Sequence, residues 1–168
     1  MKRITYIYIF ILTVTFTSCG IYSFTGISLD PDVKTFQVNR FENLALLVEP
    51  GLERDFQVSL QDLIQNQTNL SLETSNAHLV YEGEITDYRI SPTTATSEST
   101  AAQNRLTISV KIRFFNRKKP EDDLEQSFSF FYDYPGSSQL IGGLKTTAHE
   151  EIFERITQDV FNATLAKW

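Results

Sequence analysis

The alternation of apolar and polar residues from Arg105 to Asn116 constrains the fold more than any other feature of the chain. The apolar positions are Leu106, Ile108, Val110, Ile112 and Phe114, and the positions between them are Arg105, Thr107, Ser109, Lys111 and Arg113. Successive residues of a strand point to opposite faces of a sheet. The pattern therefore predicts a strand with one face on a core and the other face open to solvent.

A second strand is predicted close by, from Leu124 to Tyr134. Its aromatic residues on one face are Phe128, Phe130, Tyr132 and Tyr134. The charged connection from Asn116 to Asp123 contains Pro120 and separates the two apolar runs. Two such runs joined by a short polar segment favour an antiparallel hairpin.

Four further elements complete the predicted domain. Strands are expected from Thr35 to Phe41 and from Leu79 to Ile90, where Gly83 marks a bulge or a close approach of two backbones. Apolar residues at steps of three or four predict helices from Leu52 to Asn66 and from Ser138 to Ala166. This order predicts an α+β fold, a two-layer sandwich with two helices packed on one face of a mainly antiparallel four-stranded sheet.

The beginning of the chain is typical of a secretory leader. Lys2 and Arg3 make a positive start, and a nearly uninterrupted apolar run follows from Ile4 to Phe16. This run is too short to cross a hydrocarbon core, which needs about 20 helical residues. It fits the apolar region of a signal peptide.

Small residues then lead into Cys19, the only cysteine of the chain. The stretch from Phe16 to Gly20 resembles a bacterial lipoprotein box, which implies a signal peptide over residues 1–18 and a single domain over residues 19–168 anchored through lipidated Cys19. Two or more acyl chains would make this membrane anchoring effectively permanent. The alternative is an inert buried cysteine after a short N-terminal helix.

The charge of the chain argues against a nucleic-acid partner. The chain has 15 Lys and Arg residues against 21 Asp and Glu residues, a formal net charge of −6. Loss of Lys2 and Arg3 with the leader would take this charge to about −8. An acidic protein lacks the general attraction for phosphate backbones on which nucleic-acid binding depends.

No combination of residues predicts catalysis, a metal site or a cofactor. Glu150 and Glu151 follow His149 directly and so do not share its helix face. Glu82 and Glu84 share a strand face at a spacing that would suit glycoside hydrolysis. A solvated strand face is the more ordinary interpretation, because no aromatic or acid-tuning residue accompanies them. Since the sequence also lacks phosphate-loop and nucleophile-elbow motifs, we expect a protein that is not an enzyme.

Five segments, taken together and in order, carry a family resemblance: Cys19–Gly26, Phe36–Asn43, Tyr81–Tyr88, Asn104–Val110 and Val160–Trp168. They resemble the LptE family, the lipopolysaccharide-assembly lipoproteins of the Gram-negative outer membrane. The resemblance implies two helices on a four-stranded sheet. It also implies a lipid-anchored protein on the periplasmic side of the outer membrane, which plugs and helps assemble the β-barrel LptD while lipopolysaccharide passes to the outer leaflet.

The main alternative function is an auxiliary lipoprotein subunit of a lipid-transport ATPase system. Such a protein would share the leader, the size and the lack of catalytic residues. A third class, an anchored hydrolase, would need residues that the chain lacks.

Four basic residues near the open sheet face are the candidates for binding lipopolysaccharide or a partner: Arg89, Arg105, Lys111 and Arg113. The resemblance implies basic contacts of this kind, although ordinary surface solubility would also explain them. The stretch from Ser91 to Asn104 has seven hydroxyl residues and no large apolar group, and a loop of this length is usually functional or disordered. We expect this loop, with an Arg near each end, to form the working end of the domain.

Overall fold

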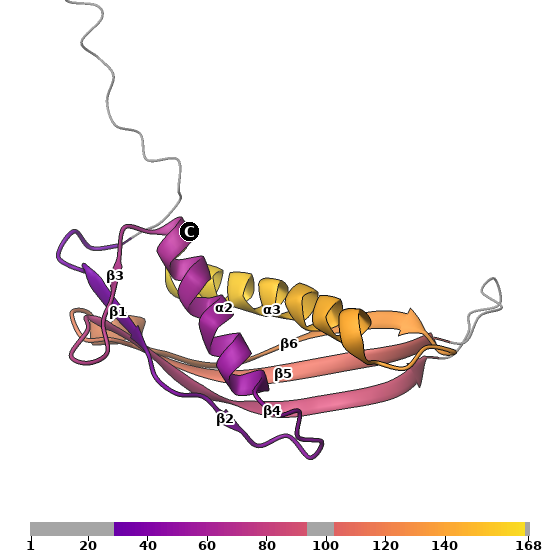
Figure 1. Cartoon of the computed structure of the whole chain (residues 1–168). Helices are drawn as coiled ribbons and strands as arrows, with labels where there is room; N and C mark the ends of the chain where they lie inside the picture. Colours follow the sequence, from indigo (N-terminus) through magenta and orange to yellow (C-terminus); the bar gives the residue numbers. More distant parts are fainter. Residues whose placement is uncertain (1–28, 94–102, 167–168) are drawn as a thin grey trace, which may run out of the picture.

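The computed structural model describes residues 29–93 and 103–166, and it has two layers (Figure 1). The predicted leader, Cys19 and the middle of the Ser91–Asn104 loop lie outside the described residues. The elements in chain order are β1 (Thr35–Val38), β2 (Glu42–Asn43), α2 (Leu52–Gln67), β3 (Ser71–Leu72), β4 (Leu79–Thr93), β5 (Gln103–Asn116), a 3-10 turn (Pro120–Asp122), β6 (Leu124–Pro135) and α3 (Gly142–Thr164).

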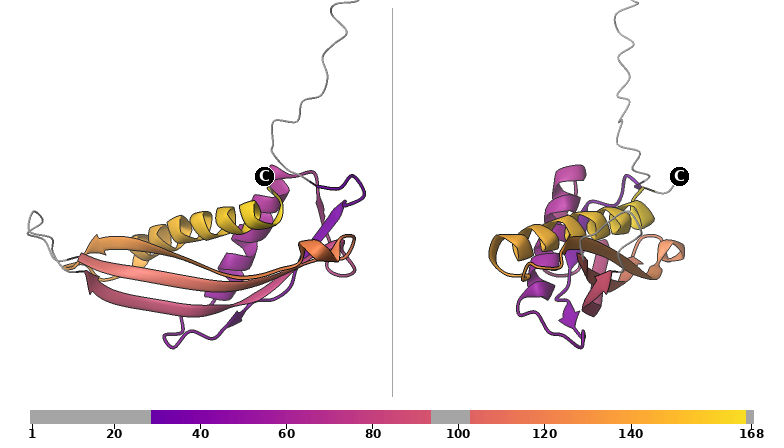
Figure 2. Two further views of the ribbon diagram at one scale, coloured as in Figure 1. Left: turned by 180° about the vertical axis from the view of Figure 1, so that it is seen from behind. Right: turned by 90° about the vertical axis from the view of Figure 1, so that its right-hand side faces the viewer.

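Both helices cover the same face of one sheet, as the α+β prediction requires, and the views in Figures 1 and 2 agree on this. The strand order is β3-β1-β4-β5-β6, and β2 also pairs with β4. Of the long strands, β4 pairs with β5 and β5 pairs with β6, both antiparallel. The predicted hairpin of residues 105–116 and 124–134 is therefore confirmed.

The rest of the sheet differs from the prediction, because the sheet has six strands rather than four. Its short strands pair in parallel: β1 with β3 and β4, and β2 with β4. The predicted strand Thr35–Phe41 is shorter than expected: only Thr35–Val38 pairs, as β1, and β2 follows at Glu42–Asn43. Because α2 follows β2 and carries the chain across the helix layer, the chain returns to the sheet in its original direction, which makes β4 parallel to β1. Strands β2 and β3 have two residues each, too short for a period of two to show in sequence.

The core lies between the helices and the inner face of the sheet. The five alternate apolar residues of β5 are at most 1% exposed. From α2, Phe56 packs edge-on against Phe41 and Phe153, with ring centroids 5.1 and 5.4 Å apart. The Tyr81 hydroxyl lies 3.0 Å from the Thr164 hydroxyl, and burial raises the pKa of Tyr81 far above its usual value. These contacts fix both helices on the sheet.

At Gly83 the backbones of β4 and β5 approach each other closely, which is one of the two alternatives predicted for this glycine. A Cβ atom at this position would collide with the main-chain carbonyl oxygen of Lys111 and would lie 3.0 Å from the Phe41 ring. The bulge of β4 lies elsewhere, between Ile85 and Asp87. A side chain at Gly83 is therefore excluded by β5 itself.

Candidate functional site

The face of the sheet away from the helices, called the open face below, carries all four predicted basic residues. On β5, Arg105, Lys111 and Arg113 alternate with the buried apolar residues. Arg89 of β4 is directly opposite Thr107 of β5 and so shares their face. The structure therefore brings the four candidates together on one surface.

The bulge in β4 decides where Arg89 points. Strict alternation from Tyr81 through Ile85 would place Arg89 on the core side. The register shift after Ile85 reverses the phase, so that Tyr88 enters the core and Arg89 faces outward. The burial pattern of β4 records this change of phase, because the buried position moves from odd residue numbers between Tyr81 and Ile85 to an even number at Tyr88.

The basic residues of the open face are paired with carboxylates. Arg113 lies between Glu82 and Glu84, with Nε 3.2 Å from Oε1 of Glu82 and Nη1 3.5 Å from Oε2 of Glu84. Hydrogen bonding to Glu82 raises the pKa of Arg113 above its usual value. Lys111 pairs with Glu125, and this contact lowers the pKa of the Glu125 carboxyl. Glu82 and Glu84 thus act as partners of a strand residue, as expected for a solvated strand face.

Arg105 is held more tightly than the other three. Its Nε and Nη2 donate to the two carboxylate oxygens of Asp133 at 2.7 and 2.8 Å. The guanidinium also lies 3.6 Å from the centre of the Phe131 ring. The ion pair raises the pKa of Arg105 and lowers that of Asp133. A ligand that binds Arg105 must therefore share it with a bidentate carboxylate.

Arg89 is the most available of the four. Its only ion pair among the described residues is with Asp87, at 3.7 Å, and its side chain is 63% exposed. Exposed pairs of this kind contribute little to stability, so a phosphate group could replace Asp87 at small cost. Residues 91–93 and 103–104 of the predicted loop extend β4 and β5, so Arg89 lies just inside the end of the hairpin.

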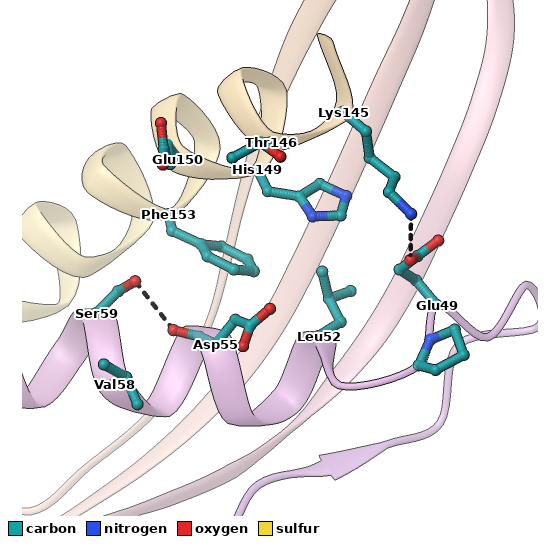
Figure 3. Close-up of a pocket in the computed structure, with 11 residues that line it drawn as sticks. Glu49, Leu52, Asp55, Val58, Ser59, Lys145, Thr146, His149, Glu150 and Phe153 are labelled. Atoms are coloured by element: carbon teal, nitrogen blue, oxygen red, sulfur yellow. Dashed lines mark hydrogen bonds and ion pairs between the residues drawn. The ribbon is translucent and has the colours of Figure 1, made fainter. Parts of the chain in front are cut away.

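A cavity of about 420 Å³ lies between α2 and the start of α3 (Figure 3). At its rim, Lys145 Nζ donates to Glu49 Oε1 at 2.7 Å. The His149 Nε2 atom lies 3.1 Å from the Tyr88 hydroxyl, and Asp55 and Phe153 lie on either side of the space. Burial lowers the pKa of His149, while burial and the charge of Glu49 raise the pKa of Tyr88 to about 12. Sequence reasoning missed this cavity, since its lining residues come from two segments far apart in the chain, 49–59 and 145–153.

The half-buried His149 predicts a pH-dependent contribution to stability. Because its pKa is lower folded than unfolded, the unfolded chain binds more protons as the pH falls through the ordinary value of 6.5. We expect wild-type protein to lose stability between pH 7.5 and 5.5, and His149→Gln to lose less over the same interval. Urea unfolding midpoints at the two pH values measure the difference. Equal losses in both proteins would show that His149 contributes nothing.

Next to this cavity, the connection between β2 and α2 exposes aliphatic side chains. Leu44, Leu46, Leu47 and Val48 are each more than half exposed, and Leu46 is entirely exposed. We call residues 44–48 the apolar loop. A cluster of exposed apolar side chains on a small domain commonly marks a contact with another molecule. The apolar loop was not predicted as a site, although its run of apolar residues is visible in the sequence.

Within residues 29–93 and 103–166, no three His, Asp or Glu side chains are grouped to hold a metal ion. In the same ranges, neither helix is long and apolar enough to cross a membrane.

Comparison with known proteins shows the family of this chain. The model of the LptE family, described as lipopolysaccharide-assembly, matches residues 33–164, which span nearly all of the described fold. The chain belongs to the LptE family. The resemblance seen in the sequence is therefore confirmed, and the chain is a member of a family of lipopolysaccharide-assembly lipoproteins.

Among similar solved structures, two with TM-scores above 0.5 show the same fold at low sequence identity. The hypothetical protein CT253 from Chlamydia trachomatis is 12% identical, with 80% of this chain and 99% of that chain covered and a TM-score of 0.52. Protein XCC0632 from Xanthomonas campestris is 11% identical, covering 83% and 90%, with a TM-score of 0.52. A minor lipoprotein from Acinetobacter baumannii is 12% identical, covering 81% and 98%, with a TM-score of 0.47. No curated protein sequence matches the chain significantly.

Proposed function

We propose that this LptE-family protein is a non-catalytic, lipid-anchored component of the outer membrane that occupies and helps assemble the lipopolysaccharide-transport β-barrel LptD. The family match over residues 33–164 carries the proposal. Cys19, at the end of an apolar leader, would hold the protein on the periplasmic side of the membrane.

The surfaces of the domain support a role in binding rather than in chemistry. The apolar loop offers a compact apolar contact to a barrel wall, and the open face offers charged groups that alternate in sign. A protein that sits inside a barrel needs contacts on several sides, and these two surfaces lie on different parts of the domain. The alternative, a subunit of a lipid-transport ATPase system, has no specific observation in its favour.

Depletion of the protein in its own cell tests the proposal. We expect lipopolysaccharide to disappear from the cell surface and the barrel to fail to reach its mature form. Normal surface lipopolysaccharide after complete depletion would contradict the proposal.

Arg89 and Arg105 are the residues that we propose for contact with lipopolysaccharide phosphates. Replacing both with Ala removes two guanidinium groups near one end of the open face, so binding of purified lipopolysaccharide should weaken by about tenfold while the melting temperature changes little. The matched control replaces Arg40 and Arg54, which lie together beside the start of α2, with Ala. Equal binding by both double variants would leave Arg89 and Arg105 with a structural role only.

A further inference from the structure

The outer edge of β6 has no partner within the described residues. β6 ends the strand order, and its twelve residues pair continuously with β5 from Leu124 to Pro135 without a register shift. Figure 1 shows it as the strand that runs along the border of the sheet beneath α3. Because residues of an antiparallel ladder alternate in direction, about half of the β6 amide and carbonyl groups point away from β5.

This edge lacks the features that usually prevent edge-to-edge pairing. Exposed edges are normally short, bulged, or interrupted by Lys or Pro. β6 contains no Lys or Arg, and its one proline, Pro135, is its last residue. The opposite side of the sheet is different, because β3 has only two residues and β1 four. An edge so long and regular is suited to accept another strand.

A cleft lies beside the same edge, on the helix side of the sheet. It has a volume of about 510 Å³ and is lined by Phe130, Glu151, Glu154, Arg155 and Gln158. The Arg155 guanidinium lies 5.5 Å from the centre of the Phe130 ring. Within the described residues, neither Glu151 nor Glu154 forms an ion pair. With two carboxylates and one guanidinium in its lining, the cleft is acidic overall, which favours a basic side chain as its occupant.

The open-face side of the edge offers a second set of contacts. Phe131 is 42% exposed there, and the only charged residues of β6, Glu125 and Asp133, lie on the same face. An added strand would place alternate side chains against this face and against the cleft. Strand addition typically works in this way, with main-chain hydrogen bonds giving affinity and alternate pockets giving specificity.

We propose that β6 is extended in the native assembly by a strand from a different protein, an extended segment with a Lys or Arg side chain directed into the cleft. A second copy of this chain is a poor occupant, because its own β6 brings only acidic charges and its other edge is short. The identification of the partner as the barrel rests on the proposed function. The addition of a strand to β6 does not rest on it.

Hydrogen exchange tests whether the edge is occupied. The tagged full-length protein is extracted with its partners from its own cell envelope and compared with the same protein purified alone. We expect amides of residues 124–135 to exchange at least about tenfold more slowly in the assembly, and amides of β4 to be unchanged. Equal exchange of β6 in both samples would overturn the proposal. Slow exchange of β6 in the isolated monomer would also overturn it, because the chain would then cover its own edge. Recovery of two differently tagged copies together would overturn it as well, because the occupant would then be a second copy.

Charge reversal tests the identity of the occupant. Glu151→Lys with Glu154→Lys should reduce protection of β6 and recovery of the partner by about tenfold, whereas Asp159→Lys, an exposed acid farther along α3, should not. Unchanged protection in the double variant would refute the basic occupant. Barrel recovery with an unprotected β6 would refute the strand addition and leave the proposed function intact. A protected β6 bound to a protein other than the barrel would support the strand addition and refute the proposed function.

Discussion

The Gly83→Ala variant is expected to be destabilised by about 1–3 kcal/mol or more, although only one methyl group is added. The new Cβ atom would collide with the Lys111 carbonyl oxygen, which belongs to the backbone of β5 and cannot move aside as a flexible side chain would. On its other side lies the Phe41 ring, which is fully buried. The two central strands would have to separate locally, and their contacts with both helices would weaken.

Chemical unfolding measures this effect, and Gly143→Ala is the matched control. Gly143 lies at the start of α3, where a Cβ atom would meet nothing within 4 Å. Since Ala favours helix by up to about 1 kcal/mol over Gly, this variant should be as stable as wild type or slightly more stable. Equal unfolding midpoints for Gly83→Ala and wild type would show that the two strands are not packed as closely as described.

The second large effect is expected at Cys19. Lipoprotein maturation requires the thiol, so Cys19→Ala should remain at precursor size without acyl chains, whereas Ser18→Ala, which keeps a small residue before the cysteine, should still be processed. Gel mobility and intact mass measure the difference. Membrane fractionation after a carbonate wash is a weaker test, because a protein bound inside a barrel would stay with the membrane. A Cys19→Ala protein of mature size would contradict the lipoprotein interpretation.

The sequence was sufficient for the elements whose patterning is local. The alternation of β5 and the apolar stripe of α2 each predict their own buried face, because a strand repeats every two residues and a helix every 3.6. Gly83 was also identified correctly, since a glycine within a strand often marks a close backbone approach. The parallel pairing of β1 and β4 was not predicted, because it depends on the path of α2 between them.

The candidate site was only partly predictable, because pairing between strands decides which charges meet. The sequence shows Arg105 and Asp133 as polar residues of two different strands, and only the register makes them a bidentate pair. Likewise, the bulge after Ile85 turns Arg89 to the open face. The cavity beside His149 depends on how α2 and α3 lie relative to each other, which no local pattern contains.

Native purification tests the central claim most directly. The tagged wild-type protein, expressed at its normal level, is recovered from detergent-solubilised membranes, and the proteins that accompany it are identified and quantified. We expect a large outer-membrane β-barrel in roughly equal amount, together with bound lipopolysaccharide. Recovery of an ATPase-type lipid-transport complex without a large barrel would contradict the account.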